Sequence, residues 1–350
     1  MALSKKLKEK ISIEVIKTLI SRFNNFPKYR AKNRNAPFHE AFLKAFSKKL
    51  KGKVSNKATF ISLSSWLHGF NATLGQTFFE NVAHHLCNGS KKQFKSNNKK
   101  QYRISKTQAI NIDHMMKELK NAEVLPNLKN ENLKIFKKFN TKSVKASNFT
   151  ADIFIEKKHS IIAIELKSVK PNSGEMNNEK RKILGGKAVL YNNFPGKKIS
   201  FYIGFPFDPT DCASNSLKTH FNKQRFMASI VDIRKYFDEK EVLIANGLWN
   251  FLSNKKNTME EILEIINTIS TPKFLSEFKF LRESKNKEGS KYLKLLLKWN
   301  LFSEYELRSN NKIINKINNN KKLKNLFNKC PFNIEGDFDD SKYKTIKKRI

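Results

Sequence analysis

Apolar residues recur at helical spacing along the first third of the chain. This spacing predicts helices over residues 1–24, 37–51, 73–88 and 107–122. The helix over 73–88 has the clearest ends, because Thr73 suits an N-cap and Asn88-Gly89 suits a helix C-terminus. The segment from 90 to 106 is rich in Lys, Asn and Ser and is therefore predicted to be a solvated loop.

The pattern changes near residue 133, where short runs of β-branched and aromatic residues replace the helical spacing. These runs predict strands over 133–139, 152–156, 161–168 and 198–206. A basic helical stretch over 174–192 separates the last two runs. Helical spacing returns after residue 213 and predicts helices over 241–252, 258–269, 273–285, 289–300, 302–316 and 318–329.

This order of elements predicts the α/β class: a small mixed β-sheet core with large N- and C-terminal helical regions. We divide the chain into an N-terminal helical region over 1–125, an α/β core over 126–212 and a C-terminal helical region over 213–350. The first region is expected to contribute an acidic helix to the core. The last is expected to bind a partner or to mediate dimerisation.

Composition adds a partner to this picture. The chain has 350 residues, and 69 Lys and Arg against 31 Asp and Glu give a net charge of +38. So large an excess favours a polyanionic partner, of which nucleic acid is the commonest, although Lys is spread along the whole chain. The 29 Phe residues and 39% hydrophobic content supply enough apolar mass for a core, which excludes a disordered basic tail.

Other features exclude classes of function. The three cysteines, Cys87, Cys212 and Cys330, are too scattered for a disulfide framework, so we expect a reducing cytoplasm. No apolar run approaches the roughly 18 residues of a membrane span, so no membrane partner is expected. The chain has no GxxxxGK pattern, so no nucleotide cofactor is expected.

The sharpest chemical feature is Asp152 followed, after twelve residues, by Glu165-Leu166-Lys167. Side chains alternate along a strand, so Glu165 and Lys167 share one face. If Lys158-His159 forms a two-residue turn, Asp152 lies directly opposite Glu165. Two opposed carboxylates repel unless a cation lies between them, and oxygen donors suit Mg²⁺. Lys167 would then neutralise a scissile phosphate or help to orient or activate water, as phosphodiester cleavage requires.

The alternative is an ordinary ion pair on an edge strand, because Glu-x-Lys also occurs at Glu118, Glu156, Glu277 and Glu283. Only the Glu165 example lies within an apolar, strand-like run that follows a second such run beginning with Asp. A zinc site at His84 and Cys87 lacks a second pair of ligands.

The segment ADIFIEKKHSIIAIELKSVKPN, which carries these residues, resembles the active site of the PD-(D/E)XK nuclease superfamily. Three further segments, ELKSVKPNSGEMNNEKRKIL, FYIGFPFDPT and EVLIANGLWNFLS, are similar to type II restriction endonucleases of the group that recognises GGNCC. The resemblance spans roughly residues 60–270. It departs from the usual motif before Asp152, where Thr150-Ala151 stand without the customary Pro.

The resemblance implies roles for individual residues. Asp152 and Glu165 would be metal ligands, and Lys167 the catalytic lysine. Glu80, in the helix GQTFFENVAHH, looks like the acidic residue that such enzymes often carry on an early helix, although a surface glutamate is equally consistent with its position. The fold implied is a PD-(D/E)XK core over 126–212.

The basic stretch after the second strand of the motif is predicted to track the DNA backbone. Its candidate DNA-binding residues are Lys170, Asn172, Lys180, Arg181 and Lys182. The sequence thus predicts a Mg²⁺-dependent type II restriction endonuclease that cuts double-stranded DNA at a short palindromic site, and a palindromic site leads us to expect a homodimer on DNA. The alternatives are a PD-(D/E)XK repair or junction nuclease and a non-catalytic basic DNA-binding protein.

Overall fold

The computed structural model describes residues 2–26, 51–52, 57–97, 100–167, 173–208, 221–283 and 289–349, apart from the side chains of 57–59 and 173. These residues form two compact units, each built from segments distant in sequence. The sheet unit comprises Met1–Leu3 and Phe79–Glu261, and the helical unit comprises Ser4–Phe78 and Ile262–Ile350.

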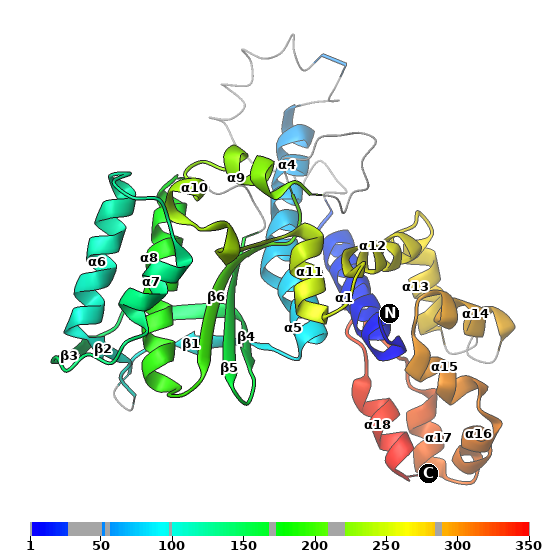
Figure 1. Cartoon of the computed structure of the whole chain (residues 1–350). Coiled ribbons are helices and arrows are strands. Elements are labelled where there is room, and N and C mark those ends of the chain that lie inside the picture. Colours follow the sequence, from blue (N-terminus) through cyan, green and yellow to red (C-terminus); the bar gives the residue numbers. More distant parts are fainter. Residues whose placement is uncertain are drawn as a thin grey trace. The chain divides into compact units, whose positions relative to one another are not determined.

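A five-stranded mixed sheet forms the centre of the sheet unit (Figure 1). Its spatial order is β1-β4-β5-β6-β7, with antiparallel pairing from β1 to β5 and parallel pairing from β5 to β7. The strands are β1 (Ser90–Phe94), β4 (Phe149–Glu156), β5 (Ser160–Leu166), β6 (Lys198–Phe205) and β7 (Val242–Ile244). A separate two-stranded sheet pairs β2 (Arg103–Ser105) with β3 (Ser143–Lys145).

Helices cover both faces of the larger sheet. On one face, α8 (Ser173–Asn193) packs so closely that a Cβ atom on Gly186 would lie 2.6 Å from the Phe201 ring of β6. α6 (Lys106–Lys120) and α7 (Leu128–Ile135) pack against α8 (Figure 1). On the opposite face are α5 (Phe79–Cys87) and α11 (Ala245–Ser253), where Leu248 of α11 approaches Gly204 of β6.

Short helical segments complete this unit: α9 (Lys223–Ser229), α10 (Ile233–Tyr236), the 3-10 turn η4 (Glu239–Glu241) and the start of α12 (Thr258–Ile269). The core between the layers is apolar, and Ile153, Ile161, Ile164 and Ile203 are fully buried on the strands. Burial of such β-branched side chains on both sheet faces explains the continuous apolar runs that mark these strands in the sequence.

The structure confirms the α/β class and the main predicted elements around the crossover. The strands predicted over 152–156, 161–168 and 198–206 correspond to β4, β5 and β6. The helix predicted over 174–192 corresponds to α8, which runs through Gly185-Gly186 without a break. The helices predicted over 1–24 and 107–122 correspond to α1 (Lys5–Asn24) and α6.

Several boundaries differ from the prediction. The strand predicted over 133–139 is wrong, because residues 128–135 form helix α7. The Asn127 side chain accepts a hydrogen bond from the Asn130 amide and caps this helix. Thr73 does not cap a helix, since its hydroxyl donates to the Gly69 carbonyl within α4 (Lys57–Thr73). The segment predicted as a loop over 90–106 contains edge strand β1. Most residues of β1 are polar and exposed, so the sequence lacks the apolar pattern that usually indicates a strand. Residues 242–244 form β7, and most of the helix predicted over 37–51 lies outside the described residues.

The helical unit is built around α1, whose Ile11 and Ile16 are fully buried. Its aromatic core includes Phe274, which stacks on Phe23 and Trp299 with ring centroids 5.8 and 5.5 Å apart. Besides α1 and α4, its elements are the π-helical turn η3 (Leu74–Phe78), the rest of α12, α13 (Phe274–Arg282), α14 (Ser290–Lys298), α15 (Phe302–Ser309), α16 (Asn311–Asn318), α17 (Lys321–Asn328) and α18 (Asp340–Arg349).

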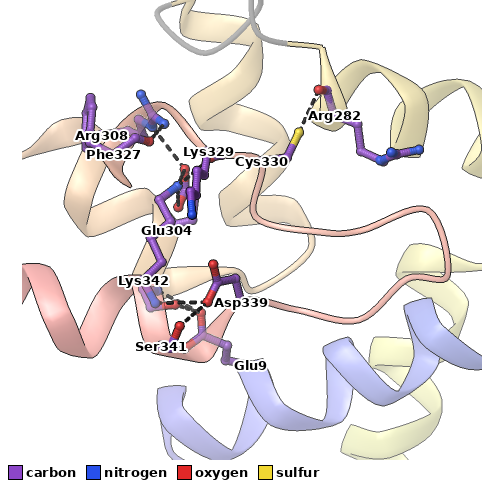
Figure 2. A network of polar contacts seen from close by, with 11 residues as sticks. Glu9, Arg282, Glu304, Arg308, Phe327, Lys329, Cys330, Asp339, Ser341 and Lys342 are labelled. Atoms are coloured by element: carbon purple, nitrogen blue, oxygen red, sulfur yellow. Dashed lines mark hydrogen bonds and ion pairs between the residues drawn. The ribbon is translucent and has the colours of Figure 1, made fainter. Parts of the chain in front are cut away.

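A buried polar network joins α15, α17 and α18 in this unit (Figure 2). Lys342 donates to both Glu304 carboxylate oxygens at 2.9 and 2.7 Å and to the Lys329 carbonyl at 3.0 Å. Arg308 donates to Glu304 at 3.0 Å and lies over the Phe327 ring. Because all three charged side chains are buried, each charge depends on its partners for solvation. Among the described helices, none has a stretch long and apolar enough to cross a bilayer.

Candidate active site

The β4–β5 hairpin has the register that the sequence predicts. Lys157 donates its backbone N–H to the Ser160 carbonyl at 2.8 Å, which closes a turn at Lys158-His159. Ile153 pairs with Ile164 in the same ladder, so the next position along sets Asp152 opposite Glu165. The predicted opposition of the two carboxylates is confirmed. Local sequence produces it, because the two-residue turn at Lys158-His159 sets the pairing of the two strands.

Two hydrogen bonds fix Asp152 at the start of the paired part of β4. Its Oδ2 accepts the Leu166 backbone N–H at 2.9 Å, across the hairpin. Its carbonyl oxygen lies 2.7 Å from Nε2 of His84 on α5, in a hydrogen bond that the ring donates. The carboxylate is therefore oriented toward the end of β5, while His84 of α5 holds the Asp152 backbone in place.

Glu165 is a buried carboxylate among charges of both signs. It is 6% exposed, and burial together with the negative charges of Asp152 and Glu179 raises the pKa of Glu165 to about 7. Lys182 of α8 opposes this shift, with its ammonium 2.6 Å from Glu165 Oε2. A carboxyl group with this pKa changes charge near neutrality, which is typical of functional sites.

Lys167 follows β5 and points to the same side of the sheet as Glu165. Its Nζ lies 2.7 Å from Oε1 of Glu179 on α8 and 3.8 Å from Oε1 of Glu165. Burial favours the neutral amine, but the hydrogen bond that Lys167 donates to Glu179 and the surrounding carboxylates outweigh burial and raise the pKa of Lys167. Lys167 is therefore held as a cation beside Glu165.

Glu80 lies close to these residues, although it comes from α5. Lys91 of β1 donates to both oxygens of the buried Glu80 at 2.9 and 3.0 Å. The same ammonium lies 3.5 Å from Asp152 Oδ1. The structure thus brings Asp152, Glu165, Lys167 and Glu80 together at one end of the β4–β5 hairpin.

The donor set fits a hard divalent cation. Asp152 and Glu165 offer carboxylate oxygens from opposed positions, and Mg²⁺ typically takes one or two carboxylates and fills its shell with water and phosphate oxygens. Among the described residues, no three His, Cys, Asp or Glu side chains already converge as a metal site. Ammonium groups instead neutralise the acids, with Lys91 at Asp152 and Lys182 at Glu165.

The candidate DNA-binding residues divide into distinct environments. Lys170 and Asn172 lie outside the described residues. Lys182 contacts Glu165 in the site, whereas Arg181, half exposed, pairs with Asp113 on α6. Lys180 is fully buried, so the structure corrects its assignment to the DNA surface.

A buried ion cluster accounts for Lys180. Its ammonium lies 2.7 Å from Glu131 and 2.6 Å from Glu241, and Lys187 lies 2.6 Å from the other Glu241 oxygen. Glu131 comes from α7 and Glu241 from η4, so the cluster ties α8 to two neighbouring elements. An ammonium without exposed surface has no route to a phosphate, because its charge is already matched inside the protein.

Sequence reasoning missed Glu179 and Lys91. Glu179 and Lys182 are three residues apart on α8 and so share a helix face, a signal that helical periodicity could have supplied. Lys91 stands in a Lys-rich segment, where nothing distinguishes it from its neighbours until β1 is seen to pair with β4.

Comparison with known proteins agrees with this geometry. Residues 3–270 match the family described as "Type II restriction endonuclease, HinfI". The chain is also 43% identical over 323 residues to the type II restriction enzyme MjaII of Methanocaldococcus jannaschii. The aligned region covers 87% of this chain and 85% of that enzyme. A mixed sheet flanked by helices is consistent with a PD-(D/E)XK-like core. The chain therefore belongs to the HinfI family of type II restriction endonucleases, enzymes that cleave DNA at specific sites.

Proposed function

We propose that this endonuclease cuts double-stranded DNA in a Mg²⁺-dependent reaction centred on Asp152, Glu165 and Lys167. The observation that carries the proposal is the hairpin register, which opposes the two carboxylates with Lys167 two residues along. Asp152 and Glu165 would hold the cation. When bound, Mg²⁺ supplies Lewis-acid activation of the phosphate and of a water nucleophile.

The protein's own groups supply charge and orientation. Lys167 is protonated in this setting, so it stabilises negative charge on the phosphate and does not accept a proton from water. Glu179 is a positioning residue, because its 2.7 Å contact fixes the Lys167 ammonium. The Leu166 N–H holds Asp152 through Oδ2. Glu80 acts at the same site as an auxiliary acid.

Substrate contacts and assembly follow from the chemistry of such a site. Lys170 and Asn172, next along the chain from Lys167, are proposed to contact DNA, and Arg181 and Lys182 extend this surface along α8. The proposed target is a short palindrome such as GGNCC, which requires two related active sites, so we expect a homodimer on DNA. In the regional division, 126–212 supplies the nuclease core, 1–125 an acidic helix, and 213–350 DNA contacts or dimerisation.

Alanine variants test the catalytic assignment. Asp152→Ala, Glu165→Ala and Lys167→Ala should each abolish cutting of unmethylated plasmid with Mg²⁺ while DNA retardation without metal persists. Glu156→Ala is a matched control, because Glu156 begins another Glu-x-Lys triplet in the same hairpin but is exposed. Normal cutting by Asp152→Ala or Glu165→Ala would refute the proposed centre.

Sequencing of the fragment ends tests the substrate. Discrete ends at one palindrome support restriction, and ends within GGNCC support that site. Nicking that depends on DNA structure instead would indicate a repair or junction nuclease. Binding without products at any Mg²⁺ concentration would indicate a non-catalytic protein. Sedimentation of the protein with a duplex carrying one site tests the homodimer.

A further inference from the structure

Lys91 occupies a special position in the edge strand of the sheet. The pairing of β1 with β4 shifts register between Ser90 and Lys92: Ser90 pairs with Phe154 and Lys92 with Ala151, so Lys91 lies opposite two residues of β4, Asp152 and Ile153. The Lys91 side chain therefore lies against the stretch of β4 that carries Asp152. Here the side chain reaches the space between two acids from different elements, Glu80 on α5 and Asp152 on β4.

The contacts around the ammonium resemble those of a cation among oxygen ligands. Lys91 Nζ has Glu80 oxygens at 2.9 and 3.0 Å and an Asp152 oxygen at 3.5 Å. The two acids are largely buried, with 11% and 14% of their side chains exposed. Buried carboxylates placed near one another require positive charge, and in this arrangement Lys91 supplies it.

The ammonium is also able to leave. The Lys91 side chain is 44% exposed, far more than either acid that it contacts. A flexible four-carbon stem lets the charged head swing into solvent or toward a DNA phosphate without backbone movement. Glu80 and Asp152 have less freedom to move, because Glu80 is buried on α5 and Asp152 is hydrogen-bonded to the Leu166 N–H.

We infer that Lys91 is an internal counter-ion that holds Glu80 and Asp152 until a divalent cation displaces it. The inference rests on the proposed function, in which Asp152 is a metal ligand. It assigns a positioning role to Lys91. In the metal-free protein, Lys91 keeps the acids in place. Its departure frees oxygens of both acids for the cation, and the competition raises the cation concentration that the site needs.

Metal binding measured without DNA tests this competition directly. Mn²⁺ is titrated into the wild type, Lys91→Met and Lys92→Met, and free Mn²⁺ is followed by electron paramagnetic resonance. Lys92 is the matched control, because it is the next lysine of β1, its Nζ lies 4.0 Å from Glu156, and its loss changes net charge equally. Circular dichroism checks that each variant folds.

Lys91→Met should bind Mn²⁺ about tenfold more tightly than the wild type, because no charge-assisted pair has to be broken first. Lys92→Met should change the affinity by less than about threefold. Mn²⁺ should also raise the melting temperature of Lys91→Met more than that of the wild type, because its two acids lack a counter-ion.

Equal affinities of Lys91→Met and Lys92→Met would overturn the inference, as would weaker binding by Lys91→Met. Addition of Asp152→Ala separates this result from failure of the proposed function. If the wild type binds Mn²⁺ and Asp152→Ala abolishes binding, the metal centre stands and only the role of Lys91 fails. If neither the wild type nor Lys91→Met shows binding that depends on Asp152, both fail.

Discussion

The raised pKa of Glu165 predicts a specific dependence of stability on pH. In the unfolded chain this carboxyl group has its ordinary pKa of 4.5, whereas in the fold burial and neighbouring acids raise the pKa to about 7. Below pH 4.5 both states are protonated, and the group has no effect on the free energy of unfolding. As pH rises through the interval, the unfolded state ionises first, so stability falls and the full cost is present above pH 7.

Glu165→Gln removes this cost, because an amide does not ionise. With pKa values of 4.5 and about 7, ionisation costs about 1 kcal/mol at pH 5 and about 3 kcal/mol at pH 8.5. The stability of the variant relative to the wild type should therefore rise by about 2 kcal/mol between these pH values. Lys182 loses a partner, but it is 25% exposed and can be solvated at either pH.

The assay has to report on the sheet unit alone. The chain contains three tryptophans, and Trp66 and Trp299 belong to the helical unit. In a Trp66→Phe/Trp299→Phe background, Trp249 fluorescence follows urea unfolding of the sheet unit, with EDTA present to exclude metal. Trp249 is 2% exposed, so unfolding changes its environment strongly.

Glu156→Gln is the control, because Glu156 is exposed on β4 and a hydrogen bond from Lys197 lowers its pKa. The pH dependence of Glu156 has the opposite sign to that of Glu165. Any stability that Glu156 contributes is present above pH 4.5 and is lost as the pH falls through its lowered pKa. Between pH 5 and 8.5 this variant should change little relative to the wild type. A Glu165→Gln difference that is equally flat would refute the assigned burial and charge environment of Glu165.

Three further predictions concern packing. Lys180→Met should destabilise the sheet unit by about 3 kcal/mol, because two buried glutamates lose a cation. The control Arg181→Ala should cost less than about 1 kcal/mol. Equal urea midpoints of the two variants would contradict the buried cluster. Gly186→Ala should destabilise the protein by about 1–3 kcal/mol, because the new methyl group clashes with the Phe201 ring of β6. Gly185→Ala, whose methyl group meets open space, should stabilise it by about 0.5–1 kcal/mol. The reverse order of melting temperatures would be inconsistent with the packing of α8. Lys342→Met should lower the stability of the helical unit by about 3 kcal/mol in calorimetry, and an unchanged transition would show that its glutamate partner is not buried.

The basic run on α8 shows where sequence reasoning stops. Lys180, Arg181 and Lys182 are consecutive basic residues, so the sequence alone predicts that all three belong to one DNA-binding surface. In a helix each successive side chain turns by about 100°. The three cations therefore face different surroundings: the ion cluster beneath α8, the solvent beside α6, and Glu165. Only the packing of α8 on the sheet decides which of the three side chains is buried, which is exposed and which lies in the active site.

Sequence by itself determined the hairpin and its chemistry. The two-residue turn at Lys158-His159 fixes a register in which Asp152 opposes Glu165, because the length of a hairpin turn sets the pairing of its strands. Tertiary structure decided the rest of the site. Lys91 and Glu80 meet Asp152 only because β1 and α5 pack beside β4, and such contacts depend on long-range docking that local pattern does not encode.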